Sequence, residues 1–261
     1  MSNNDKVKSI IQAGSEIAGA AVGSALGFFA GGPVPAAGAA VAGVALTRVL
    51  GDVASRFLSG RETMRVGGVA AIAASIIDER LKRGDELRND GFFEAGNTNE
   101  RSPADEIFEG TLLAAKNSHE EKKLLHLGAL FANVAFSQDC PPEEANFHIK
   151  TAESLTYSQF ILLRLFALKD NPFNLRQQDY KTGTQTTYAT ISLLHAIQEL
   201  CALNLAIMQR PGEPNHTIVI GINIICPSHM QLAVGGERLH NLLGLQVVED
   251  KDLESVAKWL R

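Results

Sequence analysis

Residues that commonly carry out catalysis or bind metal are sparse in this 261-residue chain. Its seven histidines form no H-E-x-x-H pair and no histidine–carboxylate box at metal-ligand spacing. His126 and His195 lie within apolar stretches, where a single histidine is more often a packed core or boundary residue than a ligand. The sequence also lacks a G-x-S-x-G nucleophile motif and a G-x-x-x-x-G-K-[ST] phosphate loop. We therefore expect no enzyme activity, no metal and no cofactor.

The cysteines and the net charge restrict the class of protein further. Cys140, Cys201 and Cys226 are odd in number, widely separated and outside any C-x-x-C pair, so neither a zinc site nor a disulfide framework is predicted. We expect a reducing compartment. The formal net charge of −5 argues against a broad nucleic-acid-binding surface.

Basic residues in the C-terminal part are the candidates for contacts with a ligand or a phosphate group. The helix predicted over residues 187–203 contains no lysine or arginine, which is a poor fit to a helix that reads a DNA groove. We therefore expect this region to bind protein, another copy of the chain, or a small or oligomeric ligand rather than DNA. The candidate contacts are Arg164, Arg176, Lys181 and Arg210.

The stretch from Ile17 to Leu46 contains no ionisable side chain and has a regular glycine pattern. Glycines at every fourth position share one face of a helix, which allows a second helix to approach closely, as in small-xxx-small membrane pairs. Helix-breaking residues follow, so we predict a helical hairpin. The glycine stripe is Gly19, Gly23, Gly27 and Gly31, and the hairpin turn is Gly32, Pro33 and Pro35.

Two interpretations of this hairpin remain open. Each arm has roughly 11 to 14 uncharged residues, whereas a straight bilayer span needs about 20. Arg48 and Asp52 lie four residues apart beyond the apolar stretch and could pair at an interface or a pore mouth. The hairpin is thus either a membrane-inserting or pore-lining element of an oligomer, or a tightly packed hairpin buried in a soluble protein. The N-terminus is not typical of a secretory signal, because Glu16 interrupts the apolar rise, and no lipidation motif is present.

Five segments are predicted along the chain, which we expect to be mainly α-helical. Ser102 and Pro103 mark one helix start, and capping boxes at Ser118 and Thr156 mark two more. The charged end of the connecting helix is either a solvated face with ion pairs or a charged collar at a membrane surface. The segments are an apolar glycine-stripe hairpin (1–60), a long connecting helix (61–88), a linker (89–102), a short-helix middle (103–155) and a C-terminal module (156–261).

The C-terminal module is expected to be an α+β unit of winged-helix type. Two helices are followed by a predicted two-stranded ribbon, Leu205–Arg210 with Thr217–Ile222, in which bulky side chains alternate. An amphipathic helix, Asp250–Arg261, ends the chain. Its predicted buried face is Leu253, Val256, Trp259 and Leu260.

This layout resembles the bacterial Abi-alpha type proteins found beside phage-defence genes. Three pieces carry the resemblance: SEIAGAAVGSALGFF, EEKKLLHLGALFANVAF, and IQELCALNLAI leading to LAVGGERLHNLL. The resemblance implies a Gly/Ala-rich N-terminal segment, a middle of short helices and a winged-helix-like C-terminal region. A related type of protein is a transmembrane effector of a two-gene anti-phage system, which a nucleotide product holds closed until infection.

The predicted function is that of an oligomeric effector that permeabilises the bacterial inner membrane when triggered, with its body in the cytoplasm. Its expected partners are other copies of the chain, the lipid membrane, and a nucleotide or oligonucleotide ligand or a partner enzyme encoded alongside. The alternative is a soluble, cytoplasmic regulatory or scaffold protein with a buried hairpin and a C-terminal module that binds a ligand, a protein or DNA.

Overall fold

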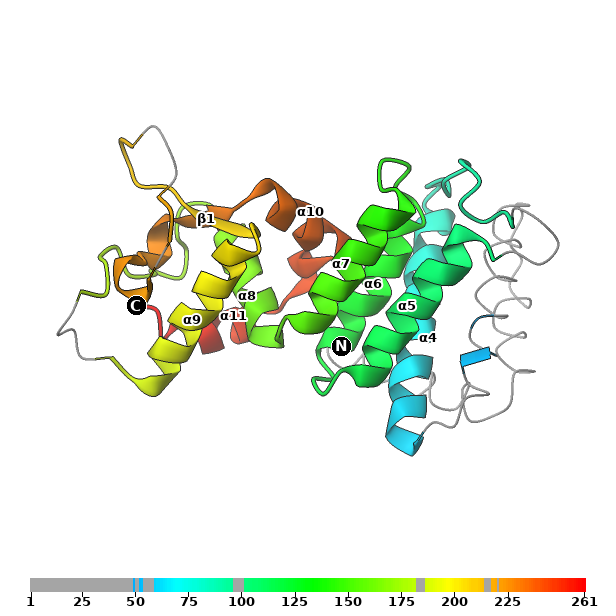
Figure 1. Ribbon diagram of the computed structural model, residues 1–261, viewed down its shortest axis with the longest axis horizontal. Helices are drawn as coiled ribbons and strands as arrows, with labels where there is room; N and C mark the ends of the chain where they lie inside the picture. Colours follow the sequence, from blue (N-terminus) through cyan, green and yellow to red (C-terminus); the bar gives the residue numbers. More distant parts are fainter. Residues whose placement is uncertain are drawn as a thin grey trace. The chain divides into compact units, whose positions relative to one another are not determined.

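The computed structural model describes residues 49, 52–53, 59–95, 101–181, 186–213, 217–219 and 221–261 (Figure 1). These residues divide after Ser154 into two compact units. They contain eight α-helices and one two-stranded sheet, which confirms the mainly α prediction. The predicted glycine stripe (Gly19, Gly23, Gly27 and Gly31), hairpin turn (Gly32, Pro33 and Pro35) and Arg48 lie outside the described residues.

Helix α4 (Gly60–Lys82) is the central element of the first unit. A capping box between Ser59 and Glu62 begins it, and residues 66–74 are buried without a break. Because successive residues turn by about 100°, nine in a row cover the whole circumference of a helix. Helices α5 (Pro103–Asn117) and α6 (Lys123–Val134) both pack against α4 (Figure 1).

A glycine makes the contact between α4 and α6 unusually close. A Cβ atom at Gly128 of α6 would lie 2.6 Å from Ile72 Cγ2 and 3.1 Å from the Val69 carbonyl oxygen of α4. Both distances are shorter than ordinary van der Waals contact, so the side chain of Ile72 occupies the space that any other residue would need. Helix α7 (Pro142–Ser154) completes this unit by packing against α5.

The connecting helix ends six residues earlier than the predicted 61–88. Gly84 adopts a left-handed conformation (φ 92°), its N–H donates to Leu81 O at 3.0 Å, and the Asp85 N–H donates to Arg80 O at 3.0 Å. This is a Schellman motif, which terminates the helix by satisfying its last carbonyl groups. The ion-paired solvated face is observed: Asp78 pairs with Lys82 at 2.6 Å and Arg80 with Asp85 at 2.7 Å.

Part of the predicted linker is an ordered piece of the first unit. Arg88 is 5 % exposed, and its guanidinium binds Asp90 through Nε at 2.9 Å and the Cys140 carbonyl oxygen through Nη1 at 2.7 Å. The guanidinium also lies over the ring of Phe92, 4.3 Å from its centroid, and Phe92 itself is buried. The hydrogen bond from Arg88 lowers the pKa of Asp90. Arg88 and Phe92 are therefore packed into the first unit, whereas Asn89 and Asp90 between them are exposed.

Helix starts were predicted with mixed success in this unit. Ser102 caps α5 by accepting from the Asp105 N–H, as predicted. The predicted capping box at Ser118 is wrong: Ser118 is instead the C-terminal cap of α5, and its hydroxyl donates to the Glu120 carbonyl oxygen. Helix α6 begins later, after Lys122, with no side-chain cap.

The second unit is built from short elements around α8 (Tyr157–Phe166). The capping box at Thr156 begins α8, as predicted, and Tyr157 donates to Asp252 at 2.9 Å to join it to the last helix. The other elements are α9 (Tyr188–Ala202), β1 (Ala206–Met208), the 3₁₀ turns η1 (Ile222–Ile224) and η2 (Pro227–His229), β2 (Met230–Leu232), α10 (Val234–Leu242), η3 (Leu245–Val247) and α11 (Asp250–Ala257).

The predicted ribbon has a different second strand. β1 pairs antiparallel with β2, with Ile207 opposite Gln231, whereas Thr217 makes only an isolated bridge to Met208. Close packing of α10 explains the choice. A Cβ atom at Gly236 would lie 1.8 Å from the Leu205 carbonyl oxygen, so only glycine lets α10 pack against the start of β1. Because β2 directly precedes α10 in the chain, this packing places β2 beside β1.

The last helix differs from its prediction at one residue of its buried face. Leu253, Val256 and Leu260 are buried as predicted, but Trp259 is 40 % exposed. Helix α11 ends at Ala257, two residues before Trp259, so the 3.6-residue period no longer fixes where that side chain points. Within the described residues, no helix combines the length and the apolarity needed to span a bilayer.

Candidate ligand-binding pocket

The basic residues predicted as ligand contacts do not form one binding surface. Nη2 of Arg210 lies 3.0 and 2.9 Å from the two carboxylate oxygens of Asp179, so its charge is already paired. Arg176 lies over the ring of Tyr180, 4.9 Å from its centroid, and its Nε donates to a backbone carbonyl. Lys181 is exposed. Arg176 and Arg210 are thus structural contacts within the second unit.

Arg48, the predicted partner of Asp52, lies outside the described residues, and one contact of Asp52 within them is with Arg101. Asp52 is exposed and pairs with Arg101 Nη2 at 3.3 Å, and Arg101 also pairs with Glu109 in the middle of α5. Asp52 and Arg101 both belong to the first unit, so the pair is a contact within it.

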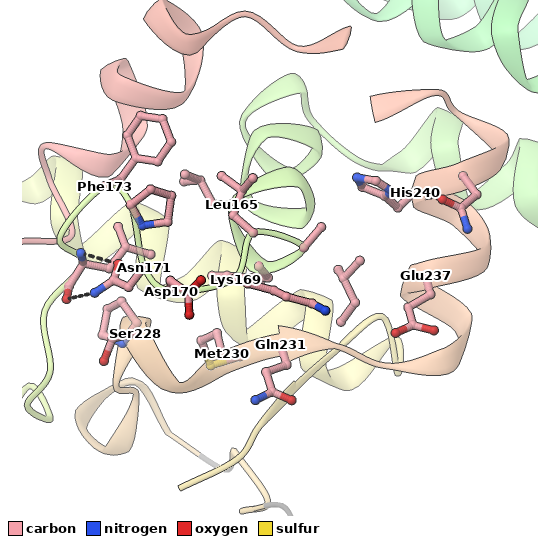
Figure 2. A pocket seen from close by; sticks show the side chains of 18 residues that line it. Leu165, Lys169, Asp170, Asn171, Phe173, Ser228, Met230, Gln231, Glu237 and His240 are labelled. Carbon is pink, nitrogen blue, oxygen red and sulfur yellow. Dashed lines mark hydrogen bonds between the residues drawn. The ribbon is translucent and has the colours of Figure 1, made fainter. Parts of the chain in front are cut away.

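A cavity of about 650 Å³ in the second unit is the strongest candidate site, and its size is typical of small-molecule pockets. Four parts of the chain surround it: the end of α8, the loop of residues 169–175, the η2–β2 segment and one face of α10 (Figure 2). Its apolar walls include Leu165, Phe173 and Met230. The same walls carry several polar side chains, so the pocket combines an apolar body with separate polar positions.

The loop that forms one rim is held in an uncommon backbone conformation. Asp170 and Asn171 both have positive φ values, 63° and 47°, in the left-handed region that aspartate and asparagine tolerate better than other non-glycine residues. The amide of Asn171 closes the loop by accepting from the Leu175 N–H at 2.7 Å and donating to the Leu175 carbonyl oxygen at 3.0 Å (Figure 2). The rim is therefore set before any ligand arrives.

His240 is the most deeply buried polar side chain of the pocket. It is 6 % exposed, and Figure 2 shows its imidazole projecting from α10 toward Leu165. Its Nδ1 lies 3.3 Å from Asn241 Oδ1, an oxygen that also accepts from Gln246 Nε2 at 3.0 Å. Because that oxygen is an acceptor, the proton of the neutral imidazole belongs on Nδ1, which leaves Nε2 as an acceptor.

The Nε2 atom of His240 is buried and has no hydrogen-bond partner among the residues that the structure describes. An unmade hydrogen bond of this kind costs about 1–3 kcal/mol, and such groups in native proteins call for an explanation. Burial lowers the pKa of His240, with the nearby charge of Arg164 acting in the same direction, whereas the contact with Asn241 and the charge of Glu237 raise it. The side chain is therefore neutral near pH 7.

Charged groups sit at the exposed rim of the pocket. Lys169, Asp170 and Glu237 line it and are all exposed, and Figure 2 shows the Lys169 amine extending toward the side on which Glu237 lies. Within the described part of the chain, no group of three histidine, cysteine, aspartate or glutamate side chains could hold a metal ion. The arrangement is suited to binding a small molecule.

Comparison with protein-family models, with curated proteins and with solved structures found no match.

Of the residues that line this pocket, sequence reasoning offered only Asp170 and Glu237, as possible pocket acids with nothing in the sequence to bring them together. Arg164 was predicted as a contact, but it is not a lining residue and influences the pocket only through its charge beside His240. The K-D-N-P run of residues 169–172 was a usable signal, because it follows the end of α8 and joins two turn-forming residues to a proline. Nothing local to residue 240 indicates that its side chain lies opposite that run.

Proposed function

We propose that the protein is an oligomeric, membrane-associated effector of a bacterial anti-phage system, which permeabilises the inner membrane when triggered. The observation that carries this proposal is the charge-free stretch Ile17–Leu46 with its glycine at every fourth position. Such a stripe supports helix packing in lipid, where apolar burial alone gives helices no reason to associate. Several copies would have to pack together, because each apolar arm is too short for a straight span.

The second unit is the proposed sensor of this effector. It holds the pocket, and its order of helices, paired strands β1 and β2, and further helices supports the proposal of a winged-helix-like module. Helix α9, in the position of a recognition helix, has no lysine or arginine, and Arg210 is paired with Asp179. These features support a small molecule or a protein as the trigger in preference to DNA.

The experiment is fractionation of cells that express the full chain, followed by a carbonate wash of the membranes. The effector proposal expects the protein to remain in the washed membranes and the cells to lose membrane potential. Replacing Gly23 and Gly27 with leucine should abolish this toxicity. The matched control replaces Ala21 and Ala25 with leucine, which places the same two leucine side chains on the opposite helix face. Equal toxicity of the two double variants would refute the role of the stripe.

A second candidate function is a soluble, oligomeric regulatory or scaffold protein, and one observation favours it. Residues 66–74 of α4 (VGGVAAIAA) are also charge-free and rich in glycine and alanine, and they are buried inside a compact unit. The chain therefore already contains one stretch of this composition that serves as protein core. Complete recovery of the protein in the soluble fraction, with residues 17–46 protected from hydrogen exchange, would favour this candidate over the effector.

A further inference from the structure

We infer that the pocket of the second unit binds a neutral, hydroxyl-bearing small molecule with an aromatic or other apolar body, and that the hydroxyl donates to His240 Nε2. This inference deepens the sensing role proposed for the second unit and rests on that role for its biological meaning. Binding itself depends only on groups that surround the pocket.

The hydroxyl follows from the state of the imidazole. The neighbouring Asn241 oxygen already accepts a hydrogen bond from Gln246, which assigns the imidazole proton to Nδ1 and makes Nε2 an acceptor. Nε2 is buried and has no partner, and His240 lines the pocket. A ligand group that donates a hydrogen bond would satisfy it, whereas an ether or a carboxylate oxygen would not.

The neutral charge follows from the groups around the pocket. Arg164 acts electrostatically on His240 and Lys169 lies on the rim, which gives two positive charges. Asp170 and Glu237 supply two negative charges on the same rim. These two positive and two negative charges balance, so the surroundings favour neither an ammonium nor an anionic group over a neutral one. A hydroxyl group donates a hydrogen bond without adding a charge, so it suits these surroundings better than an ammonium or an anionic group does.

The apolar body follows from the walls. Leu165, Phe166 and Met230 are buried side chains that line the cavity, and Phe173 from the rim loop joins them (Figure 2). A cavity of about 650 Å³ is larger than a simple alcohol needs. These apolar side chains give a ring-containing molecule a surface to pack against, beside the polar groups of the same lining.

The test is saturation-transfer NMR on the full-length protein with four probes of one shape. They are 2-phenylethanol, its methyl ether, 2-phenylethylamine and 3-phenylpropionate. We expect the alcohol to bind at least about tenfold more tightly than the ether, because a site that hydrogen-bonds a hydroxyl rejects the analogue without one. The amine and the carboxylate should bind more weakly than the alcohol. Tighter binding of either ion, equal binding of alcohol and ether, or binding of no probe would overturn the inference.

Two variants separate the pocket from surface binding. His240→Phe keeps an aromatic ring of similar size and should remove the preference for the alcohol over the ether. His195→Phe makes the same change on the exposed side of α9, away from the pocket, and should leave the preference intact. Equal effects of the two variants would also overturn the inference. Membrane association is measured separately, so a failed binding test and a failed effector proposal are distinguishable.

Discussion

Replacing Arg88 with methionine should destabilise the first unit far more than a typical arginine substitution does. Methionine keeps a long aliphatic side chain against Phe92 but removes every hydrogen bond of the guanidinium. The wild-type side chain is 5 % exposed, binds Asp90, and donates to the Cys140 carbonyl oxygen at 2.7 Å. The expected result is earlier unfolding of this unit, with no change in the second one.

The magnitude can be worked out from these contacts. Leaving the buried Cys140 carbonyl without its donor costs about 1–3 kcal/mol. Loss of the contact over the Phe92 ring adds about 1 kcal/mol. The pair with Asp90 adds at most about 1 kcal/mol, because that carboxylate is 36 % exposed and water takes the place of the guanidinium. The total is about 3 kcal/mol, which lowers the urea midpoint by about 1.5 M if the m-value is about 2 kcal/mol per molar.

Urea titration followed by far-UV circular dichroism measures this change. Fluorescence of Trp259, the single tryptophan, reports the second unit in the same samples. Arg83→Met is the matched control, because Arg83 is exposed and its loss should cost no more than about 0.5 kcal/mol. The reasoning fails if the two variants shift the midpoint equally, or if the Arg88 variant moves the tryptophan transition instead.

Two further predictions concern packing and pH. Gly128→Ala should destabilise the first unit by about 1–3 kcal/mol in thermal melts, because the new Cβ atom would overlap the Ile72 side chain. Gly110→Ala in α5 is the control. The nearest atom to its new Cβ is 3.7 Å away, so this variant should be neutral or slightly stabilising. Because burial lowers the pKa of His240, the unfolded chain takes up a proton there at a higher pH than the folded chain does. Stability of the second unit should therefore fall as the pH drops below the ordinary histidine pKa of about 6.5. We expect His240→Phe to reduce this loss of stability, measured as the difference between the urea midpoints at pH 7.5 and pH 5.5. An unchanged difference in the variant would contradict the prediction.

Helix starts that depend on neighbouring residues could be predicted from the sequence. Ser102 with Asp105 and Thr156 with Gln159 cap α5 and α8 because the two partners of each box lie three residues apart. The Ser118 prediction failed for an equally local reason. The same hydroxyl served a competing turn at the end of α5 and was no longer available to the next helix.

The features that could not be predicted depend on contacts distant in sequence. The choice of β2 as the partner of β1 required the close approach of Gly236 to Leu205, which lies 31 residues away. The alternating pattern of residues 217–222 was equally compatible with a strand, so local pattern alone gave the wrong partner. The pocket likewise brings residues 169–175 opposite His240, and only the folded chain shows that the imidazole lacks a partner.

The all-round burial of α4 has a mechanical consequence. A pull at Ser59 directed along the axis of α4 would act on a helix that is buried from residue 66 to residue 74. Such a force would shear all the side-chain contacts of the helix at the same time. The contacts could not break one after another, as they do when a strand is pulled away from a sheet from one end. Gly128 and Ile72, which are in very close contact, would have to slide past each other. Force applied at this end would therefore be resisted by the unit as a whole.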